Sequence, residues 1–429
     1  MTRRVVIVGG GAAGALVALH LLRDTTNIAE VTVVEPCERL AEGVAYSTTD
    51  AAHLLNVPAG GMSAYDDDPA HFVRWMRCDA NDFVARLRYA EYLRDELQRA
   101  AAARPQMRFA HLHESVEHIV AARRGEIRLL TAHTAASDTQ ALSADAVVLA
   151  LGNAPPTRPA WCSEVEPARL IADPWAPGAL DGIGNGERVL CIGTGLTFVD
   201  VALTLSRRGA SVTGTSRHGL LPTVHAGHVP NYHAPAHDVP APVVPAHFDS
   251  PVAVSRWLRT QPDWRAAFAA LRPHTQRIWR GFSSAQQSQF LRHARRHWDV
   301  HRHRMSQTVA DELHDRLRDG RVRVVRDDAR ALATARDFDR VVLCTGPDDT
   351  ALLQQAPLAR LVADGVVRLG PHGMGIDTDP DTGQVCDAAQ RLVGGLFAIG
   401  TLRRGTLWES TAMPELRAQA RRLAAVLDA

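Results

Sequence analysis

The sequence opens with a short apolar run that leads directly into a glycine-rich turn. Residues 5–8 are followed by Gly9-Gly10-Gly11-Ala12-Ala13-Gly14, and residues 12–23 have helical composition and spacing. Residues 31–34 then form a second β-branched run, which Glu35 ends. A buried strand that passes through a glycine turn into a helix, and then into another strand, is a βαβ unit. This order predicts a mixed α/β fold with a parallel sheet.

Each glycine of this turn has its own physical task. Gly9 permits the tight turn, Gly11 lets backbone N–H groups approach a pyrophosphate, and Gly14 lets the helix pack close to the strand. The carboxylate of Glu35 ends the next strand, where it can accept hydrogen bonds from ribose hydroxyls. Together these features predict a dinucleotide site, with a purely structural turn as the lesser alternative.

A second glycine turn repeats the pattern later in the chain. Residues 189–192 are apolar, Gly193-Thr194-Gly195 follow, and residues 211–215 form the next strand after a helix. Phe198 stands at the position of the third glycine and should hold the helix away from the strand, which would alter the pocket. Arg217 is placed to neutralise an adenosine 2′-phosphate, which favours NADPH over NADH; a solvated surface arginine is the alternative.

The composition excludes several classes of function. The 429 residues, 46% of them hydrophobic, can form two or three domains. A formal net charge of +1 gives no global attraction to nucleic acid or to an anionic membrane. The chain contains no lysine, which excludes a lysine Schiff base and a P-loop lysine. Its many arginines and alanines are typical of a bacterial protein from a GC-rich genome.

The cysteines and the hydropathy pattern indicate where the protein works. Six cysteines are scattered without a close pair in sequence, which predicts neither a disulfide framework nor a zinc site and favours a reducing compartment. After the first glycine turn, no apolar run approaches the roughly 18 residues of a membrane span. We therefore expect a cytoplasmic protein without a membrane or nucleic-acid partner.

The two βαβ units divide the chain into interrupted domains. The fold class predicted is α/β, with two Rossmann-like dinucleotide-binding domains and a mostly helical insertion. Residues 1–160 and 346–429 are expected to form the first domain, and residues 185–220 and 311–345 the second, inserted domain. Residues 221–310 are rich in Pro and His and then helical, which makes them a candidate substrate cap.

Two further strands with glycine ends carry a resemblance to a known family. Residues 145–152 end at Gly152 before two prolines, and residues 338–347 repeat this pattern around Gly346. With the segment 193–200, they resemble the two-dinucleotide-domain flavoproteins of the glutathione-reductase type. Among these, the chain is most similar to bacterial flavin-containing and N-hydroxylating monooxygenases. The resemblance covers most of the chain except residues 221–310.

The resemblance implies FAD in the first domain and NADPH in the second, with NADH as the alternative. Leu151 replaces a threonine of the family pattern, and Thr401 replaces an aspartate that holds the ribityl chain in reductase relatives. No catalytic residue and no metal ligand is assigned. The two glycine turns and the resemblance together predict a set of cofactor-binding residues. These are Gly9, Gly11, Ala12, Ala13, Gly14, Glu35, Asn56, Val116, Gly152, Gly193, Gly195, Thr197, Asp200, Arg217, Gly346, Gly400, Thr401 and Trp408.

The C-terminal part of the chain should contact the flavin ring. An amphipathic helix is predicted over residues 414–427, with Ser410 or Thr411 as its cap and Pro414 in its first turn. Its positive end could face the pyrimidine edge of the flavin. Asn56, Trp408 and Glu409 are expected nearby, although loop turns and ordinary packing explain each of them equally well.

The histidines of the insertion allow more than one interpretation. His293, His297 and His301 recur every fourth residue, so a metal site is geometrically possible. The surrounding positive charge disfavours a cation and leaves a polar helix face or a cradle for an anionic substrate. The arginines concerned are Arg292, Arg295, Arg296, Arg302 and Arg304. A mobile lid or a surface loop explains His225, His228, His233, His237 and His247.

The function expected is that of a flavin-dependent monooxygenase. NADPH would reduce FAD, and O₂ would then oxygenate a small substrate, with N-hydroxylation of an amine or amino acid favoured. The cap's charge indicates a substrate that carries a carboxylate or phosphate. The alternatives are an NAD(P)H oxidoreductase without oxygen insertion and a flavin-holding sensory or binding protein. A disulfide reductase is disfavoured, because no cysteine pair is placed against the flavin.

Overall fold

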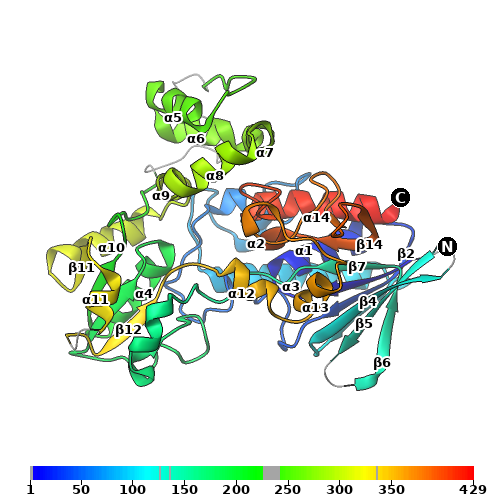
Figure 1. The fold of residues 1–429 in the computed structure, drawn as a ribbon, viewed down its shortest axis with the longest axis horizontal. Coiled ribbons are helices and arrows are strands. Elements are labelled where there is room, and N and C mark those ends of the chain that lie inside the picture. Colours follow the sequence, from blue (N-terminus) through cyan, green and yellow to red (C-terminus); the bar gives the residue numbers. More distant parts are fainter. Residues whose placement is uncertain (1–2, 125–126, 135–136, 226–241, 335–336) are drawn as a thin grey trace.

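Two mainly parallel β-sheets lie side by side in the computed structural model, and a group of helices lies above the junction between them (Figure 1). The structure describes residues 3–124, 127–134, 137–225, 242–334 and 337–429. Each sheet is built around one of the two glycine turns. The predicted α/β class with two Rossmann-like units is therefore confirmed.

The first sheet is assembled from both ends of the chain. Its strands and helices are β1 (Arg3–Val8), α1 (Ala12–Asp24), β2 (Ile28–Val34), α2 (His71–Met76), α3 (Arg86–Ala103), β3 (Arg108–Leu112), β7 (Ala146–Leu149), α12 (Asp349–Leu353), α13 (Leu358–Ala363), β13 (Gln384–Cys386), β14 (Leu392–Ala398) and α14 (Met413–Asp428). The strand order is β13-β14-β7-β1-β2-β3, with only β13 antiparallel to its neighbour. The first glycine turn therefore leaves the middle of the sheet, where α1 packs against α3 and α14.

The second sheet contains the second glycine turn. Its elements are β8 (Leu170–Ile171), β9 (Arg188–Ile192), α4 (Leu196–Arg207), β10 (Ser211–Thr215), α10 (Gln307–Arg318), β11 (Val322–Val325), α11 (Ala329–Thr334) and β12 (Arg340–Leu343). Its strands are all parallel, in the order β11-β10-β9-β12-β8. Chain from both sides of the helical insertion contributes to this sheet.

A smaller antiparallel sheet is attached below the first one. It consists of β4 (Val116–Arg124), β5 (Ile127–Thr134) and β6 (Ser137–Ala144), joined in sequence order. Along the chain, these strands lie between β3 and β7 of the first sheet.

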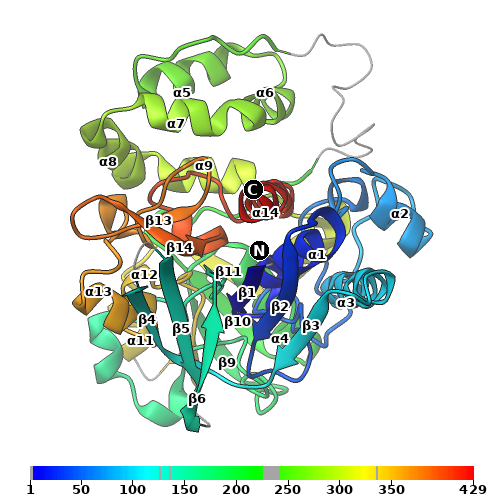
Figure 2. The same ribbon diagram turned by 90° about the vertical axis from the view of Figure 1, so that its right-hand side faces the viewer.

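The helical insertion forms a separate layer, which we call the cap. It comprises α5 (Pro251–Thr260), α6 (Trp264–Leu271), α7 (Thr275–Gly281), α8 (Ser284–His293) and α9 (Arg295–Arg302). Side chains of Ser250, Asp263 and Ser283 accept hydrogen bonds from first-turn N–H groups, which fixes where three of these helices begin. The helices α9 and α14 lie between the upper cap helices and the first sheet (Figure 2).

Candidate functional site

The first glycine turn has the geometry that a dinucleotide requires. Gly9 has φ +100°, and a Cβ on Gly14 would stand 2.0 Å from the carbonyl oxygen of Gly9. The helix α1 therefore approaches β1 as closely as only glycine allows. No side chain caps the N-terminus of α1, where Gly11 is the first flanking residue. Its first N–H groups are thus left without a side-chain acceptor, and a pyrophosphate could serve in that place.

Glu35 lies beside this turn, as its position after β2 predicts. One carboxylate oxygen accepts the N–H of Gly10 (2.7 Å), and the other accepts that of Cys37 (3.0 Å). Across the turn, a Cβ on Gly43 would lie 3.3 Å from the Cα of Gly11. Because glycines face each other here, two backbone segments can border the start of α1 closely. These residues fit a flavin dinucleotide at the first turn.

The second turn is equally dependent on its first glycine. Gly193 has φ +107°, and a Cβ there would stand 2.2 Å from the carbonyl oxygen of Cys344 on the neighbouring strand end. The Thr194 hydroxyl donates to the carbonyl oxygen of Leu220 (2.6 Å) and lies 2.8 Å from the Ser216 hydroxyl. The turn is thus tied to the segment that follows β10.

Phe198 does not obstruct the second turn. Its side chain is fully buried between α4 and β10, and it does not line the cavity described below. The ring lies against Gly214, where an added Cβ would stand 2.5 Å from a ring carbon. The glycine of β10 therefore makes room for the phenylalanine of α4, and the expected alteration of the pocket is not found.

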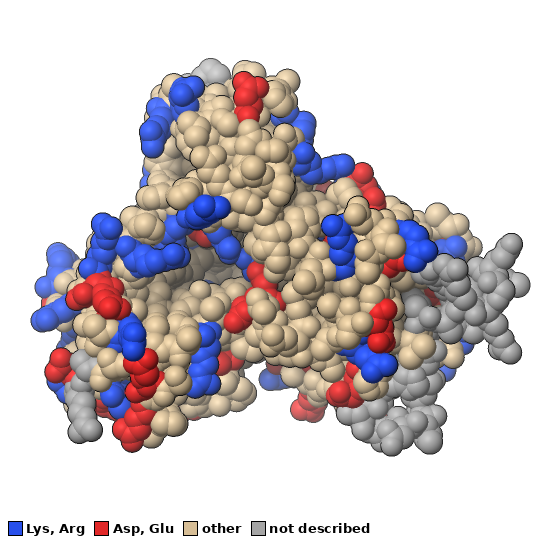
Figure 3. Space-filling model, in the orientation of Figure 1, with Lys and Arg blue, Asp and Glu red and all other residues tan. Residues whose placement is uncertain are grey.

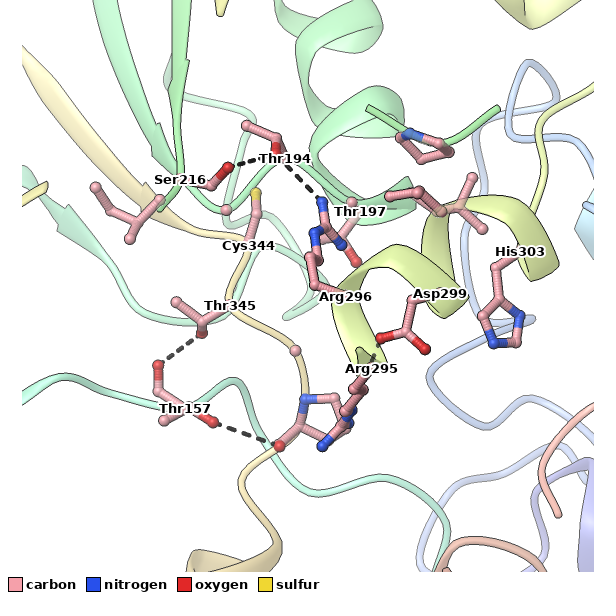
Figure 4. A pocket seen from close by; sticks show the side chains of 18 of the residues that line it. Thr157, Thr194, Thr197, Ser216, Arg295, Arg296, Asp299, His303, Cys344 and Thr345 are labelled. Atoms are coloured by element: carbon pink, nitrogen blue, oxygen red, sulfur yellow. Dashed lines mark hydrogen bonds and ion pairs between the residues drawn. The ribbon is translucent and has the colours of Figure 1, made fainter. Parts of the chain in front are cut away.

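A cavity of about 880 Å³ lies where the two sheets and the cap meet (Figures 3 and 4). The second glycine turn forms one wall, and the segment 401–411, which follows the first sheet's β14, forms another. Helix α9 of the cap contributes a third wall. The predicted cofactor residues that line this cavity are Gly193, Gly195, Thr197, Arg217, Gly346, Thr401 and Trp408.

Other predicted residues lie outside the cavity lining. Gly9, Gly11, Ala12, Ala13, Gly14 and Glu35 stay together at the first turn. Asp200 forms a buried ion pair with Arg86 (2.6 Å), which joins α4 to the start of α3. The Asn56 carbonyl lies 3.1 Å from His225 Nε2, and Val116 is buried at the start of β4.

Gly152, Gly400 and Thr401 meet between the first sheet and the cavity. The Thr401 hydroxyl donates to the carbonyl oxygen of Gly152. A Cβ on Gly400 would lie 3.8 Å from the Cβ of Ala13 in α1. The strand ends of β7 and β14 thus converge on the start of α1. This convergence brings the first glycine turn within reach of the cavity wall.

Charged side chains from two elements face the cavity. Arg295 and Asp299 lie one turn apart on α9, with 3.7 Å between Arg295 Nε and Asp299 Oδ2. Arg404 approaches from the 401–411 segment and contacts Asp349 (3.2 Å). Burial raises the pKa of Asp299, an effect that His303 and Arg295 only partly offset. This carboxyl therefore keeps its proton to a higher pH than a solvated aspartate.

The cap is fastened to the first domain by a buried ionic cluster. Glu409 is 6% exposed, accepts Trp298 Nε1–H (2.6 Å), and lies 3.4 Å from Arg302. Arg272 makes a bidentate ion pair with Glu415 (2.6 and 2.8 Å). Burial raises the pKa of Glu409, but electrostatic contact with His303 and Arg302 outweighs this and holds the pKa below its usual value. Glu409 was expected near the flavin. In the structure its carboxylate joins the cap to the segment that follows β14.

Trp408 also belongs to this docking surface. Its ring stacks on Trp279 of α7, with 5.1 Å between centroids and 25° between planes. Phe290 of α8 meets the same ring edge-on. One part of Trp408 therefore contacts the cap while the residue also lines the cavity.

The C-terminal helix begins at Met413, one residue before the predicted range, but its cap is not the expected one. The N-cap of α14 is Ala412, which offers no side-chain hydrogen bond, and Pro414 lies in the first turn as predicted. The expected caps were Ser410 and Thr411. The Ser410 hydroxyl instead donates to the carbonyl oxygen of Gly400 (3.1 Å), and Thr411 lies among the cavity-lining residues.

The three regularly spaced histidines do not share one helix face. The helices α8 and α9 are separated at Ala294, so His293 lies on a different helix from His297 and His301. His301 packs edge-on against Trp264 (5.0 Å). Within the described residues, no group of three or more His, Cys, Asp or Glu side chains could hold a metal. His228, His233 and His237 lie outside the described residues.

Two cysteines that are distant in sequence are neighbours in space. Cys191 is buried on β9, Cys344 is buried directly after the adjacent strand β12, and contact with Cys191 raises the pKa of the Cys344 thiol. They lie next to the second glycine turn, and Cys344 also lines the cavity.

Comparison with known proteins identifies the architecture. Residues 6–154 match the model of a family described as FAD-NAD(P)-binding. The ornithine hydroxylase of Pseudomonas aeruginosa aligns with a TM-score of 0.59 at 14% identity, covering 100% of this chain and 99% of that one. This chain has the fold of the two-dinucleotide-domain flavoproteins.

Two other solved structures support this flavoprotein fold. A flavin monooxygenase from Stenotrophomonas maltophilia has a TM-score of 0.58 at 18% identity, covering 100% and 98% of the two chains. An ornithine N-hydroxylase of Kutzneria sp. 744, solved with reduced FAD, NADP⁺ and L-ornithine, has a TM-score of 0.59 at 15% identity, with 100% and 99% coverage. No sequence among the curated proteins matches the chain. Among the described residues, no helix is long and apolar enough to cross a membrane.

Sequence reasoning missed several side chains that define the cavity. Arg404, Asp299 and His303 line it, and none of them belongs to a recognisable motif. Arg295 and Arg296 also line it, and the sequence indicated them only as members of an arginine-rich stretch. Helical spacing on α9 is the signal that groups Arg295, Asp299 and His303, but it cannot say which face meets a cavity.

His225 predicts a specific pH dependence of stability. It is 7% exposed, lies 3.1 Å from the Asn56 carbonyl, and burial with the nearby Arg304 lowers its pKa from 6.5 to about 4. Below pH 6.5 the His225 imidazole is protonated in the unfolded chain. In the folded chain it stays neutral until the pH falls to about 4. Stability is therefore complete above pH 6.5 and falls by up to about 3 kcal/mol toward pH 4.

The variant His225→Gln removes this titration and should show a smaller loss of stability over the same interval. Urea unfolding at several pH values measures it, with His247→Gln as the control because His247 is exposed and lies elsewhere. A His225→Gln profile parallel to that of the wild type would contradict the prediction.

Proposed function

We propose that this chain is a flavin-dependent monooxygenase that uses NADPH, FAD and O₂ to oxygenate a small substrate. One observation carries the proposal: a single cavity joins the second glycine turn to the segment that follows the last parallel strand of the first sheet. A nicotinamide and a flavin held at the two turns could therefore meet in it. The likeness to hydroxylases and a flavin monooxygenase supports the choice of reaction.

The residues at each turn have separate roles in the proposal. The turn Gly9–Gly14, with Glu35, would hold the FAD pyrophosphate and ribose. The turn Gly193–Gly195, with Thr197, would hold the nicotinamide dinucleotide. When bound, FAD accepts a hydride from NADPH and activates O₂. The protein's own contribution is to place the two cofactors and to exclude water with the cap.

The charges of the cavity favour an amino acid as substrate. Arg295 and Arg404 present guanidinium groups to the cavity, and guanidinium binds a carboxylate in a bidentate manner. Asp299 lies beside them and can hold or release a proton at its carboxyl. We infer that a substrate carboxylate binds the arginines while its amine faces the flavin side, which suits N-hydroxylation.

The proposal is tested by accounting for NADPH and oxygen together. Purified flavin-loaded protein is incubated with NADPH, ¹⁸O₂ and a panel of amines and amino acids, and H₂O₂ and product masses are measured. Incorporation of one ¹⁸O atom into a substrate, with less H₂O₂ per NADPH, is the expected result. If every NADPH yields H₂O₂ without product, the protein is an oxidoreductase that inserts no oxygen. If NADPH does not bleach the flavin, it is a binding or sensory protein.

Arg217 supplies a test of the nucleotide preference. It is exposed at the mouth of the cavity, just beyond β10, where it can contact a 2′-phosphate. Arg217→Gln should lower the affinity for NADP⁺ at least about tenfold, because a charge-assisted hydrogen bond is lost, and should leave the affinity for NAD⁺ unchanged. Isothermal titration calorimetry measures both, with the exposed cap variant Arg259→Gln as control. Equal affinities of Arg217→Gln and the wild type for NADP⁺ would show that Arg217 does not bind the 2′-phosphate.

The compartment is also part of the proposal. All six cysteines are free. Free thiols persist where glutathione or thioredoxin keeps them reduced, which supports a bacterial cytoplasmic protein.

A further inference from the structure

Arg296 of the cap reaches across the cavity to the second glycine turn (Figure 4). Its Nη2 donates to the carbonyl oxygen of Leu220 (2.8 Å) and to Thr194 Oγ1 (3.3 Å). Its Nη1 would lie 3.7 Å from a Cβ placed on Gly195. The guanidinium group therefore stands directly over the turn at which a pyrophosphate would approach α4.

Unlike Arg295 and Arg302, this guanidinium has no acidic partner among the residues that the structure describes. Arg295 lies 3.7 Å from Asp299, and Arg302 lies 3.4 Å from Glu409. For Arg296, no carboxylate oxygen of the described residues lies within 4.0 Å. Burial lowers its pKa, and the more distant Asp299 offsets this only in part. A half-buried cation held only by a hydroxyl and a carbonyl oxygen retains donors for an anion.

We propose that Arg296 is a nucleotide-binding residue that the cap supplies to the second site, where its guanidinium binds the pyrophosphate of the nicotinamide dinucleotide. The inference rests on the proposed function, because it requires that a dinucleotide occupies this site. Its position distinguishes it from Arg217. Arg296 lies over Gly195, at the fingerprint turn, whereas Arg217 lies beyond the end of β10, where a 2′-phosphate belongs.

The consequence is that nucleotide binding and cap position are coupled. Arg296 is on the same short helix as Arg295 and Asp299, which face the cavity. A pyrophosphate held by Arg296 therefore fixes α9, and with it the side chains proposed to meet the substrate. Nucleotide binding should therefore hold the substrate-facing side chains of α9 in place.

Binding of nucleotide fragments distinguishes the role of Arg296 from that of Arg217. The probes are 5′-ADP, which has a pyrophosphate without a 2′-phosphate, and 2′-AMP, which has the reverse. We expect Arg296→Gln to weaken 5′-ADP, NAD⁺ and NADP⁺ by about 10- to 100-fold and to leave 2′-AMP unchanged. Arg217→Gln should weaken 2′-AMP and NADP⁺ alone. Arg296→Lys should give an intermediate loss, because lysine keeps the charge without the planar fork.

Calorimetry on the flavin-loaded protein measures these affinities, with Arg259→Gln as the matched control on the exposed side of the cap. Wild-type affinity of Arg296→Gln for 5′-ADP would overturn the inference while leaving the proposed function intact. Failure of the wild type to bind any of the four nucleotides would overturn both.

Hydrogen exchange tests the coupling without any variant. In the wild type, 5′-ADP should slow amide exchange in α9 relative to α5, which lies elsewhere in the cap. The same probe should have no effect on α9 in Arg296→Gln. Unchanged exchange of α9 in the wild type at saturating 5′-ADP would overturn the inference, whether or not Arg296→Gln folds.

Discussion

The variant Gly14→Ala is expected to purify without bound flavin and to unfold at a markedly lower temperature than the wild type. The added Cβ would stand 2.0 Å from the carbonyl oxygen of Gly9, which is backbone and cannot rotate away. The helix α1 must therefore move off β1, and the backbone that would cradle the pyrophosphate moves with it. We expect a loss of stability of about 3 kcal/mol or more, by analogy with overpacked cores.

Flavin absorbance per protein and thermal unfolding measure this effect. The control is Gly281→Ala, since that glycine ends α7 and nothing lies within 4 Å of a Cβ placed there. Gly281→Ala should keep its flavin and its unfolding temperature. A flavin content of Gly14→Ala equal to that of the control would show that α1 does not form the FAD site.

Removing the carboxylate of Glu409 is expected to loosen the cap. Its side chain is 6% exposed and lies 3.4 Å from Arg302, whose side chain is 11% exposed. In Glu409→Ala the guanidinium of Arg302 keeps, among the residues that the structure describes, only the carboxylate of Glu415, at 3.6 Å, and Trp298 Nε1–H loses its acceptor. Breaking one side of a buried pair in this way costs about 3–5 kcal/mol.

The control for Glu409 is an exposed ion pair between the same two residue types. Glu164 and Arg330 approach to 2.8 Å with side chains 43% and 60% exposed, so Glu164→Ala should cost at most about 1 kcal/mol. Limited proteolysis should cleave the cap of Glu409→Ala much faster than that of Glu164→Ala. Equal cleavage rates and equal unfolding free energies of the two variants would show that the cluster does not hold the cap.

The sequence predicted the scaffold well because local patterns determine it. The apolar run before Gly9 and the one before Gly193 each predict a buried strand. The glycines that follow each run permit the tight turn from that strand into a helix. The order of apolar β-branched runs and segments with helical spacing along the chain was enough to predict both βαβ units. The insertion of the second unit followed from where its strands resumed, at residues 322–325.

Side chains that depend on tertiary contacts were predicted less well. Phe198, on α4, looked like an obstruction because the compensating residue, Gly214, lies on a different element, β10. Asp200 matches a family motif, yet Arg86 from α3 pairs with it at the junction of the two sheets. In both cases the decisive neighbour is distant in sequence, and a single chain pattern contains no information about it.

The cap was the least predictable part for the same reason. Its composition indicated many cations, but not that Arg296 would point to the glycine turn while Arg302 pairs with Glu409. The break at Ala294 also divides the histidine repeat, although the spacing itself is consistent with one helix. Which neighbours the side chains of a helix face becomes known only when the position of that helix against the rest of the protein is known.

The stacked Trp279–Trp408 pair gives the molecule an optical signal of its own. Two indoles whose centroids are 5.1 Å apart couple their electronic transitions, and one of them belongs to the cap while the other belongs to the segment after β14. Any movement that lifts the cap separates the rings and abolishes the paired circular-dichroism band that such coupling produces. Cap opening can therefore be followed in the unlabelled protein, in real time and without a substrate.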